Sequence, residues 1–132
     1  MKKNLFITVL FLFLITSVVS AADFNTCQKL YNDNKFKDAS TCFFYRVQAD
    51  NNDVQSRFYY AASLYFDRQL YMAYNQYQYI ADNYPNTEIG NYSKQEAAKV
   101  KQRIEHIRVS KANDTGIMLQ NYLIHLNGHK CQ

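Results

Sequence analysis

Two consecutive stretches of this chain carry the same apolar pattern at an offset of 34 residues. The first stretch places it at Leu30, Tyr31, Phe36, Ala39, Phe43 and Val47, and the second at Leu64, Tyr65, Leu70, Ala73, Tyr77 and Ala81. A fixed period of this length is typical of stacked repeats, in which no single unit can bury its apolar face alone. Such arrays mostly hold other chains, so the period favours binding over catalysis.

Within each unit the apolar residues recur at steps of three and four, which is the spacing of a helix rather than a strand. Polar segments at residues 32–34, 50–53 and 67–69 separate these runs and are expected to be turns. Asp53 is placed to cap a helix, and Pro85 is expected to end one because proline lacks an amide hydrogen. The sequence thus predicts helices over about 23–32, 36–49, 54–66 and 70–83.

The C-terminal part has a different pattern from the two repeats. Ser93 and Glu96 have the spacing of a capping box, which predicts that a helix begins at about residue 94. The segment Asn113-Asp114-Thr115 is expected to interrupt that helix, and Gly128 is expected to close a short last one. We therefore expect a capping pair of helices over about 92–127.

The first 21 residues have the layout of a secretory signal peptide. A Met1-Lys2-Lys3 start precedes an apolar run from Leu5 to Val19, and small residues follow as far as Ala22. A retained anchor is the alternative, although the run is shorter than the roughly 20 apolar residues of a membrane span. No second apolar run follows, so we expect no integral span after signal removal and a periplasmic or secreted protein. Repeat 1 is then about 23–52 and repeat 2 about 53–86.

The charge of the chain argues against nucleic-acid binding. The net charge is only +4, and two of the positive charges belong to the predicted signal segment. Binding to a phosphate backbone needs a dense basic face. The basic residues between 94 and 111 alternate with Glu96 and Glu105, so this segment is interpreted as a solvated helix face.

The repeat pattern resembles the tetratricopeptide repeat, whose 34-residue unit is a pair of antiparallel helices. The resemblance is carried by small residues where helices cross, by aromatic residues and by a closing proline: Cys27, Leu30, Tyr31, Ala39 and Phe43, then Ala61, Leu64, Tyr65, Ala73, Tyr77 and Pro85. Arg46 and Ile80 depart from it, because a third small residue is usual there. The helix end Tyr84-Pro85-Asn86 is also similar to that of bacterial envelope repeat proteins, such as those of the Tol–Pal and outer-membrane assembly systems.

The resemblance implies an all-α fold of hairpins stacked as a short right-handed superhelix. In such a fold the first helix of each unit lines the concave side, which is the usual binding surface. The residues that these helices offer there are Gln28, Tyr31, Gln55, Phe58, Tyr59, Ala62, Tyr65, Phe66, Tyr92, Glu96 and Lys99. Exposed tyrosine-rich faces are enriched at protein contacts, so we expect a protein- or peptide-binding groove. The alternative is that the following repeat buries these side chains.

The three cysteines suggest one disulfide. In the first hairpin Cys27 and Cys42 are expected on facing helices, beside a crossing lined by Ala39, within the distance that a disulfide requires. Two buried free thiols are the alternative. The oxidising environment of an exported protein favours the bond. Cys131 is then either free or able to form a disulfide with a second chain.

Little in the sequence indicates catalysis. His125 and His129 are four residues apart, but Gly128 is expected to end the helix between them, which disfavours a shared metal. The triplet Asp114-Thr115-Gly116 is that of aspartic proteases, but it lacks their preceding strand. We therefore expect no enzyme and no cofactor, and interpret the chain as an envelope scaffold or adaptor. The alternatives are a small secreted effector or enzyme inhibitor, and an enzyme accessory with a C-terminal metal.

Overall fold

A computed structural model describes residues 22–128, which form helices joined by short turns, with no strand in that range. The all-helical prediction is confirmed. The predicted signal segment, His129 and Cys131 lie outside the described residues. The helices are α2 (Phe24–Asn32), α3 (Phe36–Ala49), α4 (Val54–Phe66), α5 (Leu70–Asn83) and α6 (Glu88–Gly128).

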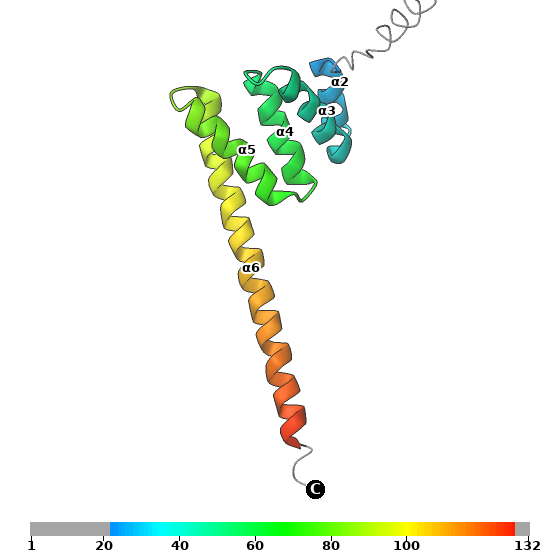
Figure 1. The fold of residues 1–132 in the computed structure, drawn as a ribbon, viewed down its shortest axis with the longest axis vertical. Helices are drawn as coiled ribbons and strands as arrows, with labels where there is room; N and C mark the ends of the chain where they lie inside the picture. Colours follow the sequence, from blue (N-terminus) through cyan, green and yellow to red (C-terminus); the bar gives the residue numbers. More distant parts are fainter. Residues whose placement is uncertain (1–21, 129–132) are drawn as a thin grey trace, which may run out of the picture.

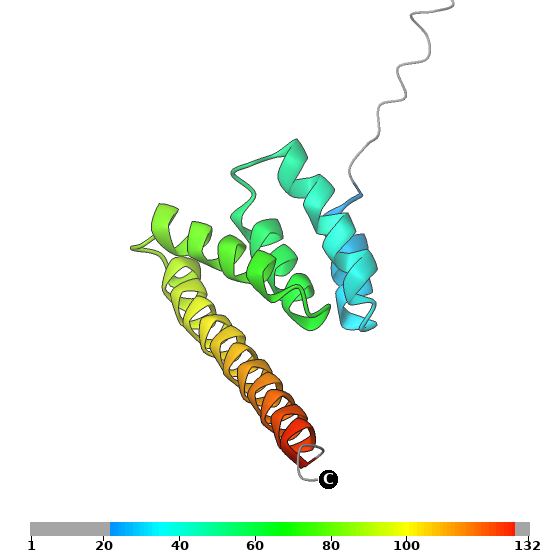
Figure 2. The ribbon, with the colours of Figure 1, turned by 60° about the horizontal axis from the view of Figure 1, so that its bottom comes forward.

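The helices form two antiparallel hairpins, α2–α3 and α4–α5, followed by the much longer α6 (Figures 1 and 2). The hairpins stack because α4 packs against α3 and touches α2, while α6 packs along α5 and touches α4. The first helices of successive units, α2, α4 and the start of α6, therefore lie next to one another. We call the surface that they share the first-helix face.

The 34-residue period of the sequence is repeated in the backbone. Helix α5 begins and ends 34 residues after α3, and α6 begins 34 residues after α4. The two hairpin turns use the same unusual conformation, since Asn34 has φ 59° and Arg68 has φ 64°. Each turn is closed by an equivalent backbone hydrogen bond, Lys35 N to Leu30 O at 2.9 Å and Gln69 N to Leu64 O at 2.8 Å.

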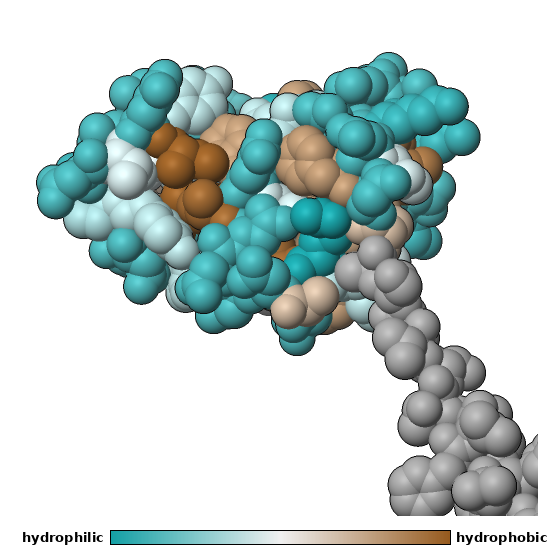
Figure 3. All heavy atoms as spheres, turned by 90° about the horizontal axis from the view of Figure 1, so that it is seen from above, coloured by the Kyte–Doolittle hydropathy of each residue, from teal (hydrophilic) through white to brown (hydrophobic). Residues whose placement is uncertain are grey.

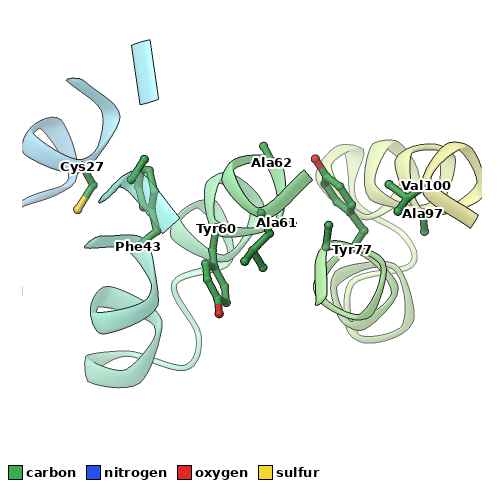
Figure 4. Packing of buried hydrophobic residues seen from close by; sticks show 11 residues of the cluster. Cys27, Phe43, Tyr60, Ala61, Ala62, Tyr77, Ala97 and Val100 are labelled. Carbon is green, nitrogen blue, oxygen red and sulfur yellow. The ribbon is translucent and has the colours of Figure 1, made fainter. Parts of the chain in front are cut away.

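One apolar cluster runs through the whole stack (Figure 4). Small residues of the repeat pattern, Ala39, Ala61 and Ala73, are fully buried where the helices cross. Large side chains fill the space between them, including Phe43 in the first hairpin and Val100 on α6. Fully burying such a side chain contributes about 1.5–3 kcal/mol, so stacking is what stabilises the units.

The start of α6 differs from the prediction. The helix begins at Glu88, and Ser93 lies inside it with a buried hydroxyl that has no hydrogen-bond partner among the described residues, so the predicted capping box is wrong. The hydroxyl of Thr87 instead accepts a hydrogen bond from the N–H of Gly90 at 3.1 Å. Asp53 makes the equivalent bond at the start of α4, where its Oδ1 accepts from Ser56 N at 2.9 Å.

The expected pair of capping helices is also wrong, because α6 is one continuous helix that includes Gly128. No break occurs at residues 113–115. Thr115 is accommodated by turning its hydroxyl back to the carbonyl oxygen of Lys111 at 2.9 Å, a bond that lets threonine remain in a helix. A helix of 41 residues is about 60 Å long, and Figure 1 shows it extending well beyond the hairpins.

The second half of α6 has no packing partner among residues 22–128. Val100 is its last buried side chain and Ile104 its last half-buried one, and every side chain described after that is exposed. We call residues 109–128 the distal segment. Among the described residues no helix is long and apolar enough to span a bilayer.

Candidate binding groove

An open groove lies on the first-helix face where α4 and α6 begin. Its volume is about 550 Å³, and it is lined by Gln55, Phe58, Tyr59, Thr87, Glu88, Ile89 and Tyr92. Seen from the end of the molecule at which these two helices begin, apolar groups gather in patches between hydrophilic ones (Figure 3). The groove thus brings together four of the predicted binding residues and three residues that were not predicted.

Aromatic rings form the apolar part of the groove. The ring of Phe58 is half-buried and lies 5.5 Å from that of Tyr77 and 5.6 Å from that of Tyr92, centroid to centroid. Tyr77 is buried beneath, and burial raises the pKa of its hydroxyl, which therefore stays neutral. Tyr92 is 50% exposed and is the ring most open to a partner. Such rings bury a large area with little loss of conformational freedom.

Polar groups line the rest of the groove. Gln55 and Glu88 are both exposed, and Thr87 is occupied by its bond to Gly90. The predicted capping box places the start of the third helix only at about residue 94, so the sequence does not indicate Thr87, Glu88 and Ile89 as binding residues. The 34-residue period was the signal that could have located them, since Thr87 is the counterpart of Asp53.

Tyr59 belongs more to the packing between α2 and α4 than to a free surface. Its ring stacks on Phe43 at 5.3 Å and meets Tyr31 edge-on at 5.4 Å. Its hydroxyl accepts a hydrogen bond from Gln28 Nε2 at 3.0 Å. Burial raises the pKa of Tyr31. Ala62 is buried, at 6% exposed, and supports the face from beneath, whereas Tyr59 is half-buried and still lines the groove.

The remaining predicted binding residues lie outside the groove. Phe66 is 51% exposed but stacks on Phe36 at 4.7 Å, and it joins the two hairpins at their turns. The hydroxyl of Tyr65 accepts a hydrogen bond from Arg103 Nη1 at 3.0 Å. Lys99 donates to Glu96 at 2.6 Å, and this bond raises the pKa of the lysine.

The consecutive aromatic residues of α4 are divided between its two sides. Tyr59 faces α2, whereas Tyr60 is buried and lies 5.9 Å from the ring of Phe44 on α3. Among the aromatic residues of α4, Phe66 is exposed, while Phe58 and Tyr65 are half-buried. The exposed aromatic area on the face is therefore smaller than the sequence suggests, and Tyr92 is the most exposed ring in the groove.

The predicted disulfide is present. Cys27 of α2 and Cys42 of α3 are bonded across the first hairpin, with their α-carbons 5.4 Å apart. Cys27 is fully buried, and Phe24 and Phe43 pack over the same region in edge-on contact at 5.6 Å. The bond therefore fixes α2, the shortest helix described, to the rest of the stack.

The groove combines aromatic side chains with an amide, a hydroxyl and a carboxylate. Glu88 is its only acid, and no histidine, cysteine or lysine lines it. Within residues 22–128 no three histidine, cysteine, aspartate or glutamate side chains gather as metal ligands would. Aromatic walls beside an amide and a carboxylate suit an apolar side chain on an extended peptide.

Scans against family models, curated proteins and solved structures found no match for this sequence.

Proposed function

We propose that this chain is a non-catalytic adaptor of the tetratricopeptide-like class that binds a protein or peptide in the groove between α4 and α6. The observation that carries this proposal is an open groove of about 550 Å³ with an exposed aromatic ring at its edge and no paired catalytic groups. The groove takes an apolar or aromatic side chain against Phe58 and Tyr92. Gln55 and Glu88 then hydrogen-bond to the backbone of the bound segment.

Selection from a library of random peptides displayed on phage, with the protein immobilised, tests this proposal. We expect enriched peptides that share an apolar or aromatic residue and that bind the Tyr92→Ala variant at least about 10-fold more weakly, the loss expected when a ring of this size is removed from a contact. Tyr71→Ala is the matched control, because Tyr71 is 64% exposed on α5 away from the groove. Equal binding of the selected peptides to the natural chain, to Tyr92→Ala and to Tyr71→Ala would refute the groove as the binding site.

We further propose that the protein is exported with removal of the N-terminal segment. The intramolecular disulfide supports this, since such bonds persist in oxidising compartments. The carbonyl oxygen of Ala22 accepts a hydrogen bond from Arg46 Nη1 at 3.0 Å, which favours cleavage after Ala21 over cleavage after Ala22. Mass spectrometry of the protein secreted by a bacterial host will show Ala22 as its first residue, and a chain that keeps Met1 would contradict export.

A further inference from the structure

The distal segment of α6 carries an uncharged apolar face. Val109, Ala112, Gly116, Leu119 and Leu123 recur at alternating steps of three and four, which keeps them in one row along the helix. Val109, Leu119 and Leu123 are 57%, 59% and 57% exposed. Nothing in residues 22–128 covers this row, which we call the distal face.

The distal face is separate from the row with which α6 packs on α5. At 100° per residue, the row of Val100, Ile104 and Ile107 lies about a third of a turn away. Continued along the helix, that row is interrupted by Lys111 and Asp114. The distal face has no charge in it, and its borders at Asn113, Thr115 and Gln120 are uncharged, with Arg108 as a charged border residue at its start.

Gly116 has no role in the fold of the single chain. It lies inside the helix without a positive φ, and a β-carbon added there meets no atom within 4 Å. Glycine at such a position lowers helix stability relative to alanine. Its physical use is to let another backbone approach closely.

We propose that the distal face pairs with the same face of a second copy, with the two helices antiparallel. When Gly116 lies opposite Leu119 of the other copy, Ala112 lies opposite Leu123. Each contact then joins a small residue to a large one, as close packing requires.

The same sequence fits a parallel pair poorly. Gly116 would face Gly116 and Ala112 would face Ala112, which leaves voids because no large side chain lies opposite these small residues. The antiparallel register also avoids collision with the hairpins. The end of one helix, residue 128, comes opposite Ile107 of the other, where α6 leaves the hairpin stack. The charged border residue Arg108 lies near opposite ends of the antiparallel pair in the two copies, roughly 28 Å apart along the helix axis, so the two copies of it do not repel each other closely.

Sedimentation equilibrium of the exported chain tests this pairing over roughly 1 µM to 1 mM, because one helix pair forms a small interface that dissociates on dilution. Cys131→Ser is present throughout, so that an intermolecular disulfide cannot produce the association. We expect a two-chain mass at the high end of this range. A single-chain mass at every concentration would overturn the proposal.

Three variants test the face and the direction of the helices. Leu119→Glu places a charge in the contact and is expected to weaken dimerisation by roughly 100-fold or more. Met118→Glu is its control, because Met118 is 65% exposed one residue away, off the distal face, and should change dimerisation less than about threefold. Equal effects of the two substitutions would refute the distal face.

Gly116→Leu distinguishes the two directions. In the antiparallel pair the added side chain collides with Leu119 of the other copy, and we expect at least about 10-fold weaker dimerisation. In a parallel pair two added leucines would fill the void at Gly116, so stronger dimerisation would overturn the antiparallel arrangement. Circular dichroism verifies that each variant keeps its helices, and the open space around Gly116 in the single chain leaves its fold undisturbed.

Discussion

The backbone of Gly90 packs directly against the carbonyl group of Tyr84 at the turn between α5 and α6. A β-carbon at position 90 would overlap the Tyr84 carbonyl oxygen and lie 2.7 Å from its carbonyl carbon. The turn is held further by Thr87, whose hydroxyl donates to Tyr84 O at 2.7 Å while accepting from Gly90 N. This contact sets how α6 leaves the turn, and therefore how Tyr92 is placed at the groove.

Gly90→Ala is therefore expected to destabilise the fold, because the atoms that must move belong to the backbone. We expect the free energy of unfolding to fall by about 1–3 kcal/mol. Gly116→Ala is the matched control in the same helix, where the added methyl group has open space and should stabilise by up to about 1 kcal/mol. Urea unfolding of both variants in dilute solution measures the difference. A change in the free energy of unfolding with the same sign for both variants would contradict this account.

Loss of the disulfide is expected to loosen the first hairpin. The bond between Cys27 and Cys42 closes a loop of 15 residues, which the chain-entropy model values at about 3 kcal/mol. We expect the Cys27→Ser/Cys42→Ser double variant to lose roughly that much stability in denaturant. A reducing agent should have the same effect on the natural chain and none on the variant. Unchanged unfolding of the natural chain under reduction would refute this role.

Asp53 is expected to make the stability of the fold depend on pH. Burial by itself would raise the pKa of Asp53, but hydrogen bonds from Ser56 and Arg46, with the charge of Arg46, outweigh it and lower the pKa overall. Because the folded chain holds this carboxylate ionised, its contribution is present above about pH 4 and is lost as pH falls through the lowered pKa.

Asp53→Asn will remove this contribution. We expect about 1–3 kcal/mol lower stability at neutral pH and a smaller further loss on acidification than in the natural chain. Asp38→Asn controls for the lost charge, since Asp38 is an exposed residue of α3. Thermal unfolding between pH 7 and pH 2 measures the effect, and parallel profiles for the natural chain and Asp53→Asn would show that the hydrogen bonds of this carboxylate do not matter.

Two neighbouring phenylalanines of α3 are expected to respond differently to truncation. Phe43 is fully buried between the hairpins, so Phe43→Ala should lower stability by about 3–5 kcal/mol. Phe44 is 38% exposed and packs against Tyr60 from outside, so Phe44→Ala should lower it by less than half as much. Urea unfolding measures both losses. A larger loss of stability for Phe44→Ala than for Phe43→Ala would mean that Phe43 does not belong to the apolar core between the hairpins.

The two repeats were predictable because three kinds of signal agreed in them. Apolar spacing, polar turns and the 34-residue offset all place helices at 36–49 and 70–83, where α3 and α5 are found. The C-terminal helix was not predictable from local signals alone. Ser93 and Glu96 have capping spacing but lie within a helix that the turn at Tyr84–Thr87 has already begun.

The groove was partly predictable for the same reason. Sequence spacing placed Phe58 and Tyr92 on one face, and their rings meet at 5.6 Å. Spacing does not say how much of a side chain its neighbours cover, so it places Ala62 at the binding surface although Ala62 is buried, and it does not reveal that packing leaves Tyr59 only half-exposed in the groove. Arg46, which stands where a small residue is usual, fits because its guanidinium is held by Ser56 Oγ at 2.8 Å and by Asp53 at 2.9 Å.

The unbroken length of α6 fixes the spacing between the groove and the far end of the molecule. The groove involves the first turn of this helix, and the middle of the distal segment lies roughly 40 Å further along it. A peptide can therefore occupy the groove while the distal face is paired with a second copy. In the antiparallel pair the two grooves would stand roughly 80 Å apart, facing separate ends, so a single short peptide cannot bridge them whereas a long or repetitive partner can.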